Sequence, residues 1–199
     1  MRASIAVVAL ACIAGATAHA QQPPQAASAT PDQSTLDYRL QPRQIAPDTW
    51  VIEGAVADFL PANGCNIINT AFIATGEGVI VVNTGPSRLY GEQQRRAIAA
   101  TTPQPVRMVL NLNLHPDYFF GNQAWDGVPT QALAGSIAGM QAEGDGYADN
   151  LYRLCGGWMR GTQATPARQT LQPGSFTLGT HRLELRRLQG HTGDDLVLI

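Results

Sequence analysis

Three short segments of this chain combine histidine, acidic and glycine residues in patterns that could do metal chemistry. They are Val82–Pro86 (VNTGP), Asn113–Tyr118 (NLHPDY) and Gly190–Asp195 (GHTGDD). Zinc accepts imidazole and carboxylate ligands in a tetrahedral set, and a catalytic zinc keeps one position open for water. The candidate ligands are therefore His115, Asp117 and His191.

Taken singly, each of these signals is weak. A lone histidine is more often a polar surface or helix-cap residue than a ligand, and an aspartate after proline is commonly a turn residue. Each segment, however, directly follows or precedes an expected strand. Loops beyond the carboxyl ends of strands in an α/β fold are where functional side chains converge over a rigid support.

The elements that must position these segments follow an α/β pattern. Gly76–Gly78 predicts a hairpin turn between two strands, and a helix over Leu89–Ala100 is ended by Pro103 and Pro105. Strand, turn, helix and strand in this order predict a βαβ unit with parallel neighbours. The expected strands are Thr49–Glu53, Cys65–Ala74, Val79–Val82 and Val106–Leu112.

The last third of the chain predicts helix and then strands. Residues 131–160 are expected to be helical, with Gly144 and Gly146 separating two pieces. The second piece, Tyr147–Met159, places apolar residues on one stripe. Phe176–Leu178 and His181–Leu185 alternate like a hairpin, and Leu196–Ile199 is an apolar strand.

The N-terminus predicts export. Residues 1–20 have a positive start, an apolar run and the small-residue pattern Ala18-His19-Ala20 of a signal peptide, so the mature chain should start near Gln21 in the periplasm or outside the cell. A lipoprotein reading at Cys12 is weaker. Residues 21–37 are polar and proline-rich and predict a disordered leader, which leaves one domain over residues 38–199.

Composition excludes some classes of function. The formal net charge is −2 and the basic residues are scattered, which argues against nucleic acid as the main partner. Beyond the signal peptide, no segment is long and apolar enough to span a membrane. Cys65 and Cys155 remain after signal removal; they could pair in an oxidising compartment or stay as separate thiols.

Together, the three segments resemble the metallo-β-lactamase superfamily. Its pattern is a strand ending in Asp-Thr-Gly, then His-x-His-x-Asp-His, then Gly-His-Thr before an apolar strand. Within it, the chain is most similar to the quinoprotein relay system zinc metallohydrolases, periplasmic proteins associated with quinoprotein dehydrogenases. The runs that carry this likeness are Asn63–Ile67, Asn83–Arg88, Phe119–Gln123 and Ala148–Leu154.

The resemblance implies roles for particular residues. His115 and His191 would be ligands of a first zinc, and Asp117 would ligate a second zinc and position the attacking water. Asn113 stands at the first histidine of the motif and would be a weak ligand, because an amide oxygen is a poor donor to zinc. Tyr118 stands at the last histidine, and Asn83 stands at the aspartate of Asp-Thr-Gly.

The resemblance also implies an incomplete fold. An αββα sandwich is expected, with the N-terminal half and the start of the second half present and with apolar faces left exposed. The family's remaining ligands would lie beyond residue 199. The expected function is a zinc-dependent hydrolase of esters, lactones or amides with weakened or lost activity. The alternatives are a non-catalytic accessory protein of a quinoprotein dehydrogenase system and a decayed gene fragment.

Overall fold

Buried side chains alternate between two faces along the central strands of this chain. The computed structural model describes residues 32–199, so the expected signal peptide and most of the expected leader lie outside the described residues. Phe72, Val81 and Val109 pack on one face of the sheet. Their neighbours Ile73, Ile80 and Leu110 pack on the other face. This period of two predicts a sheet covered on both sides.

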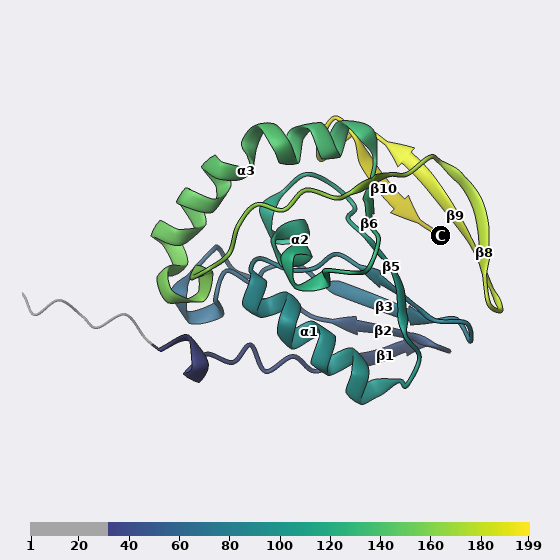
Figure 1. The fold of residues 1–199 in the computed structure, drawn as a ribbon, viewed down its shortest axis with the longest axis horizontal. Helices are drawn as coiled ribbons and strands as arrows, with labels where there is room; N and C mark the ends of the chain where they lie inside the picture. Colours follow the sequence, from purple (N-terminus) through teal and green to yellow (C-terminus); the bar gives the residue numbers. More distant parts are fainter. Residues whose placement is uncertain (1–31) are drawn as a thin grey trace, which may run out of the picture.

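Two sheets form the body of the molecule (Figure 1). The larger has the order β1-β2-β3-β4-β5-β6-β7, with strands Arg43–Ala46, Thr49–Ile52, Thr70–Ala74, Val79–Val82, Val106–Leu110, Thr130–Ala132 and Gln169–Thr170. The smaller has the order β10-β9-β8, with β8 at Gly174–Leu178, β9 at His181–Leu188 and β10 at Asp195–Leu198.

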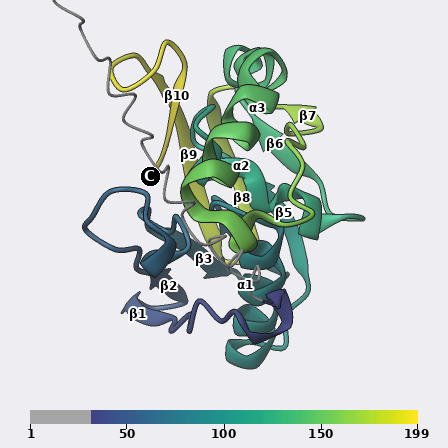
Figure 2. The ribbon, with the colours of Figure 1, turned by 90° about the vertical axis from the view of Figure 1, so that its left-hand side faces the viewer.

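The helices gather on one side of the large sheet. They are α1 (Arg88–Thr101), α2 (Pro116–Phe119) and α3 (Ala134–Cys155), with 3₁₀ turns η1 (Gln33–Thr35), η2 (Pro61–Asn63), η3 (Phe120–Trp125) and η4 (Gly156–Met159). Both ribbon views place α2 between α1 and α3 (Figures 1 and 2). Among residues 32–199, no helix has the length and apolar character needed to cross a bilayer.

The opposite face of the large sheet is covered by the small sheet. Leu183, Leu185 and Leu196 of β9 and β10 pack against Ile80 and Leu110 of the large sheet. The expected βαβ unit is confirmed, because β4 and β5 are parallel and α1 connects them. The expected hairpins β3–β4 and β8–β9 are also confirmed.

Several sequence predictions of local structure were wrong. The expected strand from Cys65 begins only at Thr70, because Gly64 and Cys65 have positive φ angles of 61° and 62° and form a turn. The helix over residues 134–155 continues through Gly144 and Gly146, since packing against the core outweighs the low helix propensity of glycine. The short strands β1 and β7 were missed, and β6 lies where the helix expected over residues 131–160 was to begin.

Residues 32–37, at the end of the expected leader, are held by contacts with the domain. Asp32 caps η1 by accepting the backbone N–H of Ser34. Gln33 then donates its side-chain amide to the carbonyl of Arg160 at 3.0 Å. These contacts fix residues 32–37, the end of the expected leader, against the turn that follows α3.

Of the two alternatives for Cys65 and Cys155, pairing or separate thiols, the structure has the pairing. Cys65 and Cys155 form a disulfide that joins residues 90 positions apart in the sequence. Both residues are buried, with 0% and 2% exposure. The bond connects the loop after β2 to the end of α3.

Candidate functional site

The predicted site residues lie on two loops at one end of the sheets. β5 ends at Leu110, and the next residues lead to His115, which is the N-cap of α2. His191 lies in the turn between β9 and β10. The small sheet folds back over the large one, and this brings the two loops together across 76 residues of sequence.

His115 and His191 are in direct contact. Nδ1 of His115 lies 3.0 Å from Nε2 of His191, and the ring centroids are 4.5 Å apart. Partial burial and the neighbouring His191 both lower the pKa of His115. One nitrogen of this pair must donate and the other must accept, so the contact favours at least one neutral imidazole.

Asp117 lies in the first turn of α2, two residues after His115. It is 5% exposed, and burial raises the pKa of its carboxyl from 3.8 to about 6, opposed by its own backbone N–H and by His191. Its carboxyl forms no side-chain hydrogen bond that ties it to a neighbour within residues 32–199. The Asp117 carboxyl is therefore poorly solvated, and it gains or loses its proton close to neutral pH.

Asn113 and Tyr118 lie in the same region, and Asn113 stabilises the loop that carries His115. Oδ1 of Asn113 accepts the backbone N–H of His115 at 2.9 Å, so the amide oxygen expected as a weak ligand stabilises the turn. Tyr118 is half-buried, and burial raises the pKa of its phenol. Its ring lies 6.5 Å from His115 and 6.4 Å from His191, measured between centroids.

Asn83 connects the loops that follow β4 and β5. It has a φ of 60°, which asparagine tolerates better than most residues. Its Oδ1 accepts the backbone N–H of Leu112 at 3.0 Å, and its carbonyl accepts the side-chain amide of Gln94. Asn83 thus supports the loop that leads to His115 and does not reach the histidine pair.

Asp194 and Asp195 hold the turn that carries His191. Neither was predicted from the sequence as a site residue. Oδ2 of Asp195 accepts the backbone N–H groups of His191 at 3.0 Å and Thr192 at 2.8 Å. Partial burial would raise the pKa of Asp195, but these bonds outweigh it and hold the pKa below its usual value. Asp194 accepts the N–H of Gly135 at 2.8 Å and so attaches the turn to the start of α3.

A buried amide network supports the other loop. Asn111 and Asn122 form reciprocal side-chain hydrogen bonds of 3.1 and 2.8 Å, and Asn111 also donates to the carbonyl of Tyr118. Thr84 donates its hydroxyl to Asn122 at 3.0 Å. The polar residues at strand ends, Asn111 and Thr84, were the signal in the sequence that could have located this network.

A small cleft opens beside the histidine pair. Its volume is about 300 Å³, and its walls include Asn113, Tyr118, His191 and Asp195. Tyr147 of α3 approaches His115 from another side, with ring centroids 6.4 Å apart, and donates its hydroxyl to Glu143. The cleft therefore borders the imidazole of His191, with Leu112, Leu188 and Leu196 as its apolar wall.

The residues present do not fit a catalytic zinc. Tetrahedral zinc with Zn–N distances of about 2.0–2.1 Å separates two ligand nitrogens by about 3.3 Å, so the histidine pair matches one edge of such a set. Within residues 32–199, however, no group of three His, Cys, Asp or Glu side chains is placed to hold one metal ion. Catalytic zinc sites use three protein ligands.

Solved structures show which fold this arrangement belongs to, whereas no family model and no curated relative matches the chain. A metallo-β-lactamase from Pontibacter korlensis aligns with a TM-score of 0.60 at 19% identity, over 80% of this chain and 66% of that protein. FIM-1 from Pseudomonas aeruginosa, solved in a mono-zinc form, aligns with a TM-score of 0.56 at 20% identity. That alignment covers 80% of this chain and 64% of FIM-1.

A third neighbour, a metallo-β-lactamase with a HARLDQ motif from Cronobacter sakazakii, aligns with a TM-score of 0.55 at 19% identity. The alignment covers 80% of this chain and 59% of that protein. The chain thus spans about two thirds or less of the length of these structures. The sandwich of helices on one sheet and a second sheet on its other face, with loops that bring His115 and His191 together, is the metallo-β-lactamase fold.

Proposed function

We propose that this chain is an exported relative of the metallo-β-lactamase-fold zinc hydrolases whose metal site is reduced and whose hydrolase activity is weak or lost. The observation that carries this proposal is the His115–His191 contact at 3.0 Å without a third ligand of the metal-binding types among the described residues. A metal that is held weakly cannot lower the pKa of its water enough to make a nucleophile at neutral pH.

The substituted positions of the metal-binding motif support the proposal of a reduced metal site. In the pattern His-x-His-x-Asp-His, this chain keeps the second histidine and the aspartate as His115 and Asp117. The HARLDQ motif of the Cronobacter sakazakii neighbour keeps the first histidine and the aspartate instead. Departures at these positions therefore occur in another protein of this fold.

The test compares the wild-type chain with two kinds of variant. Chromogenic esters and lactones are offered with added zinc, and we expect wild-type turnover at the level of the buffer. The double variant Asn113→His/Tyr118→His should bind zinc at least about tenfold more tightly, because it adds imidazole ligands. Wild-type turnover well above buffer that His115→Ala removes and His181→Ala preserves would contradict the proposal.

Export is the second part of the proposal, and the first twenty residues support it. Expressed in a Gram-negative host, the chain should be recovered from the periplasm with a mature N-terminus near Gln21. N-terminal sequencing checks this. Recovery of full-length protein from the cytoplasm alone would refute the export.

We further propose that the chain acts together with a periplasmic quinoprotein dehydrogenase system. The runs Asn83–Arg88 and Phe119–Gln123 support it, and both now have structural roles beside the site. Deletion of the gene should lower quinoprotein-dependent substrate oxidation, and the variant His115→Ala/His191→Ala should restore it, because the role proposed in this setting is not catalytic. An unchanged oxidation rate after deletion would count against this setting.

A further inference from the structure

Two imidazoles and a phenol lie close together at one end of the sheets. Nδ1 of His115 and Nε2 of His191 are 3.0 Å apart, and the Tyr118 ring is nearly equidistant from the two imidazole rings, at 6.5 and 6.4 Å between centroids. Tyr118 stands where the family motif has its last histidine, so a phenol oxygen replaces a nitrogen donor. Zinc sites in proteins are built from imidazole, thiolate and carboxylate, and a phenol does not belong to that set.

The distance between the two nitrogens fits two neighbouring ligands of one metal ion. With metal–nitrogen bonds of about 2.0 Å, nitrogens 3.0 Å apart subtend an angle of about 97° at the metal. This angle is closer to the angle of about 90° in a square-planar or tetragonal set than to the tetrahedral angle of about 109°. The histidine pair therefore favours a tetragonal ion over a tetrahedral one.

The tilt of the two imidazole rings supports a shared ion. A linear contact between two ring nitrogens 3.0 Å apart would place the ring centroids about 5.3 Å apart. The centroids of His115 and His191 are only 4.5 Å apart, so the rings are bent away from a linear contact. Two imidazoles that bind one ion have such a bent arrangement, because both nitrogens then point to a third atom beside the line that joins them.

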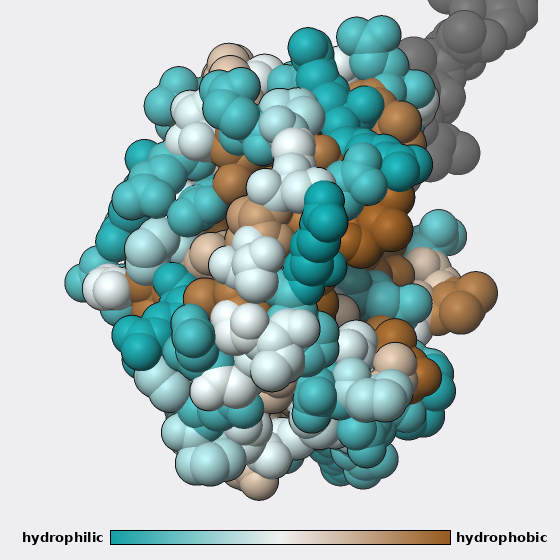
Figure 3. Space-filling view, turned by 90° about the vertical axis from the view of Figure 1, so that its right-hand side faces the viewer, coloured by the Kyte–Doolittle hydropathy of each residue, from teal (hydrophilic) through white to brown (hydrophobic). Residues whose placement is uncertain are grey.

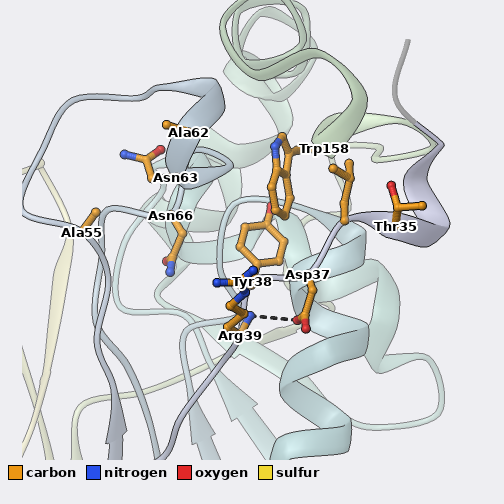
Figure 4. Close-up of a pocket in the computed structure, with 10 residues that line it drawn as sticks. Thr35, Asp37, Tyr38, Arg39, Ala55, Ala62, Asn63, Asn66 and Trp158 are labelled. Carbon is orange, nitrogen blue, oxygen red and sulfur yellow. Dashed lines mark hydrogen bonds between the residues drawn. The ribbon is translucent and has the colours of Figure 1, made fainter. Parts of the chain in front are cut away.

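Tyr118 is better placed than the other tyrosines of the chain to supply a third ligand. Tyr38 is packed beside Trp158 at a separate cavity of about 540 Å³ that neither histidine lines (Figure 4). The hydroxyl groups of Tyr38 and Tyr90 are bonded within the fold, and Tyr152 is exposed on α3. Tyr118, in contrast, lines the cleft beside the histidine pair.

Tyr147 is the other tyrosine near the pair. Its ring lies 6.4 Å from that of His115, but its hydroxyl donates to Glu143 of the same helix. The oxygen of Tyr118 has a hydrogen bond with the side chain of Asn113, at the edge of the same cleft. Tyr118 is therefore the phenol that is close to both imidazoles, and Tyr147 is the natural comparison for it.

The loops that carry the two histidines are fixed by hydrogen bonds. Asn113 accepts the backbone N–H of His115 at 2.9 Å, and Asp195 accepts that of His191 at 3.0 Å. The ligands are thus held in place before an ion binds, which lowers the cost of ordering them. The cleft of about 300 Å³ beside Tyr118 leaves room for a water molecule as a further ligand.

We propose that His115, His191 and Tyr118 form a copper(II) site. The inference rests on the reduced zinc site proposed above and names the metal that the changed donors suit. Nitrogen and oxygen donors in a tetragonal set are typical of copper(II), which also binds a given set of donors more tightly than zinc does. Asp117 lies outside this set, because within residues 32–199 no three His, Cys, Asp or Glu side chains are grouped around one point.

The test is a copper(II) titration of the tag-free chain, in a buffer whose glycine removes loosely held copper. Electron paramagnetic resonance and visible absorption follow the binding. We expect one copper per chain, nitrogen couplings from two imidazoles and a visible charge-transfer band from the phenolate to copper. Zinc at about tenfold excess should not displace the copper, because copper(II) is the stronger binder.

Variants show which side chains hold the ion. Tyr118→Phe should abolish the charge-transfer band and weaken copper binding at least about tenfold, because it removes one ligand and keeps the ring. Tyr147→Phe is the matched control and should keep both the band and the affinity. His115→Ala, checked for folding by circular dichroism, should lose the bound copper, whereas His181→Ala should retain it.

Three results would each overturn the copper site. They are less than one copper per chain in the glycine buffer, a spectrum that Tyr118→Phe leaves unchanged, and loss of the band in Tyr147→Phe. None of them bears on the proposed loss of zinc-dependent hydrolysis. That proposal fails instead if zinc supports a turnover that His115→Ala removes, so the two failures are distinguishable.

Discussion

Asp117 is a buried acid of the candidate site whose pKa differs from that of an exposed carboxyl. A carboxyl with a folded pKa of about 6 binds its proton more tightly in the folded chain than in the unfolded one. The stability it contributes is therefore complete below about pH 4 and is lost as the pH rises through about 6. The loss amounts to about 3 kcal/mol for a shift of this size.

Asp117→Asn removes this titration. In metal-free protein, the free energy of unfolding of the wild type should fall by about 2–3 kcal/mol relative to the variant between about pH 4 and pH 7.5. Urea unfolding in chelator at both pH values measures the difference. Parallel stability profiles of the two proteins would show that burial does not perturb this carboxyl.

At the residue scale, the sequence predicted the convergence of His115 with His191 but not the hydrogen bonds that support it. Post-strand loops indicate where side chains gather, and the two histidines do meet. The bond from Asn113 to the backbone of His115 depends on a rotamer, and the bond from Asp195 to His191 depends on the turn geometry. Neither is fixed by residue type or spacing.

At the scale of elements, the contact between the His191 turn and α3 depends on Gly135. A Cβ atom there would lie 2.4 Å from Oδ2 of Asp194. Gly135→Ala should therefore destabilise the chain by about 1–3 kcal/mol, since it displaces a partly buried hydrogen bond.

The control for Gly135→Ala lies in the same helix. Nothing lies within 4 Å of a Cβ atom at Gly146, so Gly146→Ala should stabilise the chain by about 0.5–1 kcal/mol. Chemical denaturation of both variants tests the pair. Equal effects of the two substitutions would mean that the turn is not attached to α3 through Gly135.

The disulfide also links two elements, and its removal should lower the stability of the chain. Cys65→Ala/Cys155→Ala should lower the free energy of unfolding by about 2–5 kcal/mol, because the bond closes a long loop. Urea unfolding of this variant, and of the wild type with reductant, measures the loss. A stability unchanged in both would exclude a structural role.

Elements with strong local patterns could be predicted from the sequence, and those fixed by tertiary contacts could not. The continuous apolar run Val79–Val82 and the helix expected over Leu89–Ala100, which Pro103 and Pro105 end, gave elements of the right type. β6 and β7 are short strands, and only pairing with neighbours defines them. The continuity of α3 through two glycines is likewise a result of packing.

At the scale of the whole molecule, the outer face of the small sheet is mostly polar. Figure 3 shows apolar patches interrupted by hydrophilic side chains on this side of the molecule. Arg182 and Arg186 of β9 are exposed there, whereas Leu183 and Leu185 face the core. On this sheet, the expected exposed apolar face consists of separate side chains such as Leu188 and Ile199, which are 51% and 57% exposed.

Strand β10 remains at an edge of its sheet. Leu196 is buried and its N–H donates to the carbonyl of Leu112 at 2.7 Å, which ties the strand to the loop that leads to His115. The loop that carries His115 and the edge of the small sheet are therefore one structural unit. A change that frees β10 would also displace His191.

The central claim is that a metallo-β-lactamase fold is retained here with a metal site reduced to two imidazoles. Zinc content by mass spectrometry tests it most directly, after the purified chain is loaded with zinc and dialysed at neutral pH. We predict well under one zinc per chain in the wild type and a further decrease in His115→Ala/His191→Ala. One or more zinc ions retained per chain, with hydrolytic turnover, would contradict it.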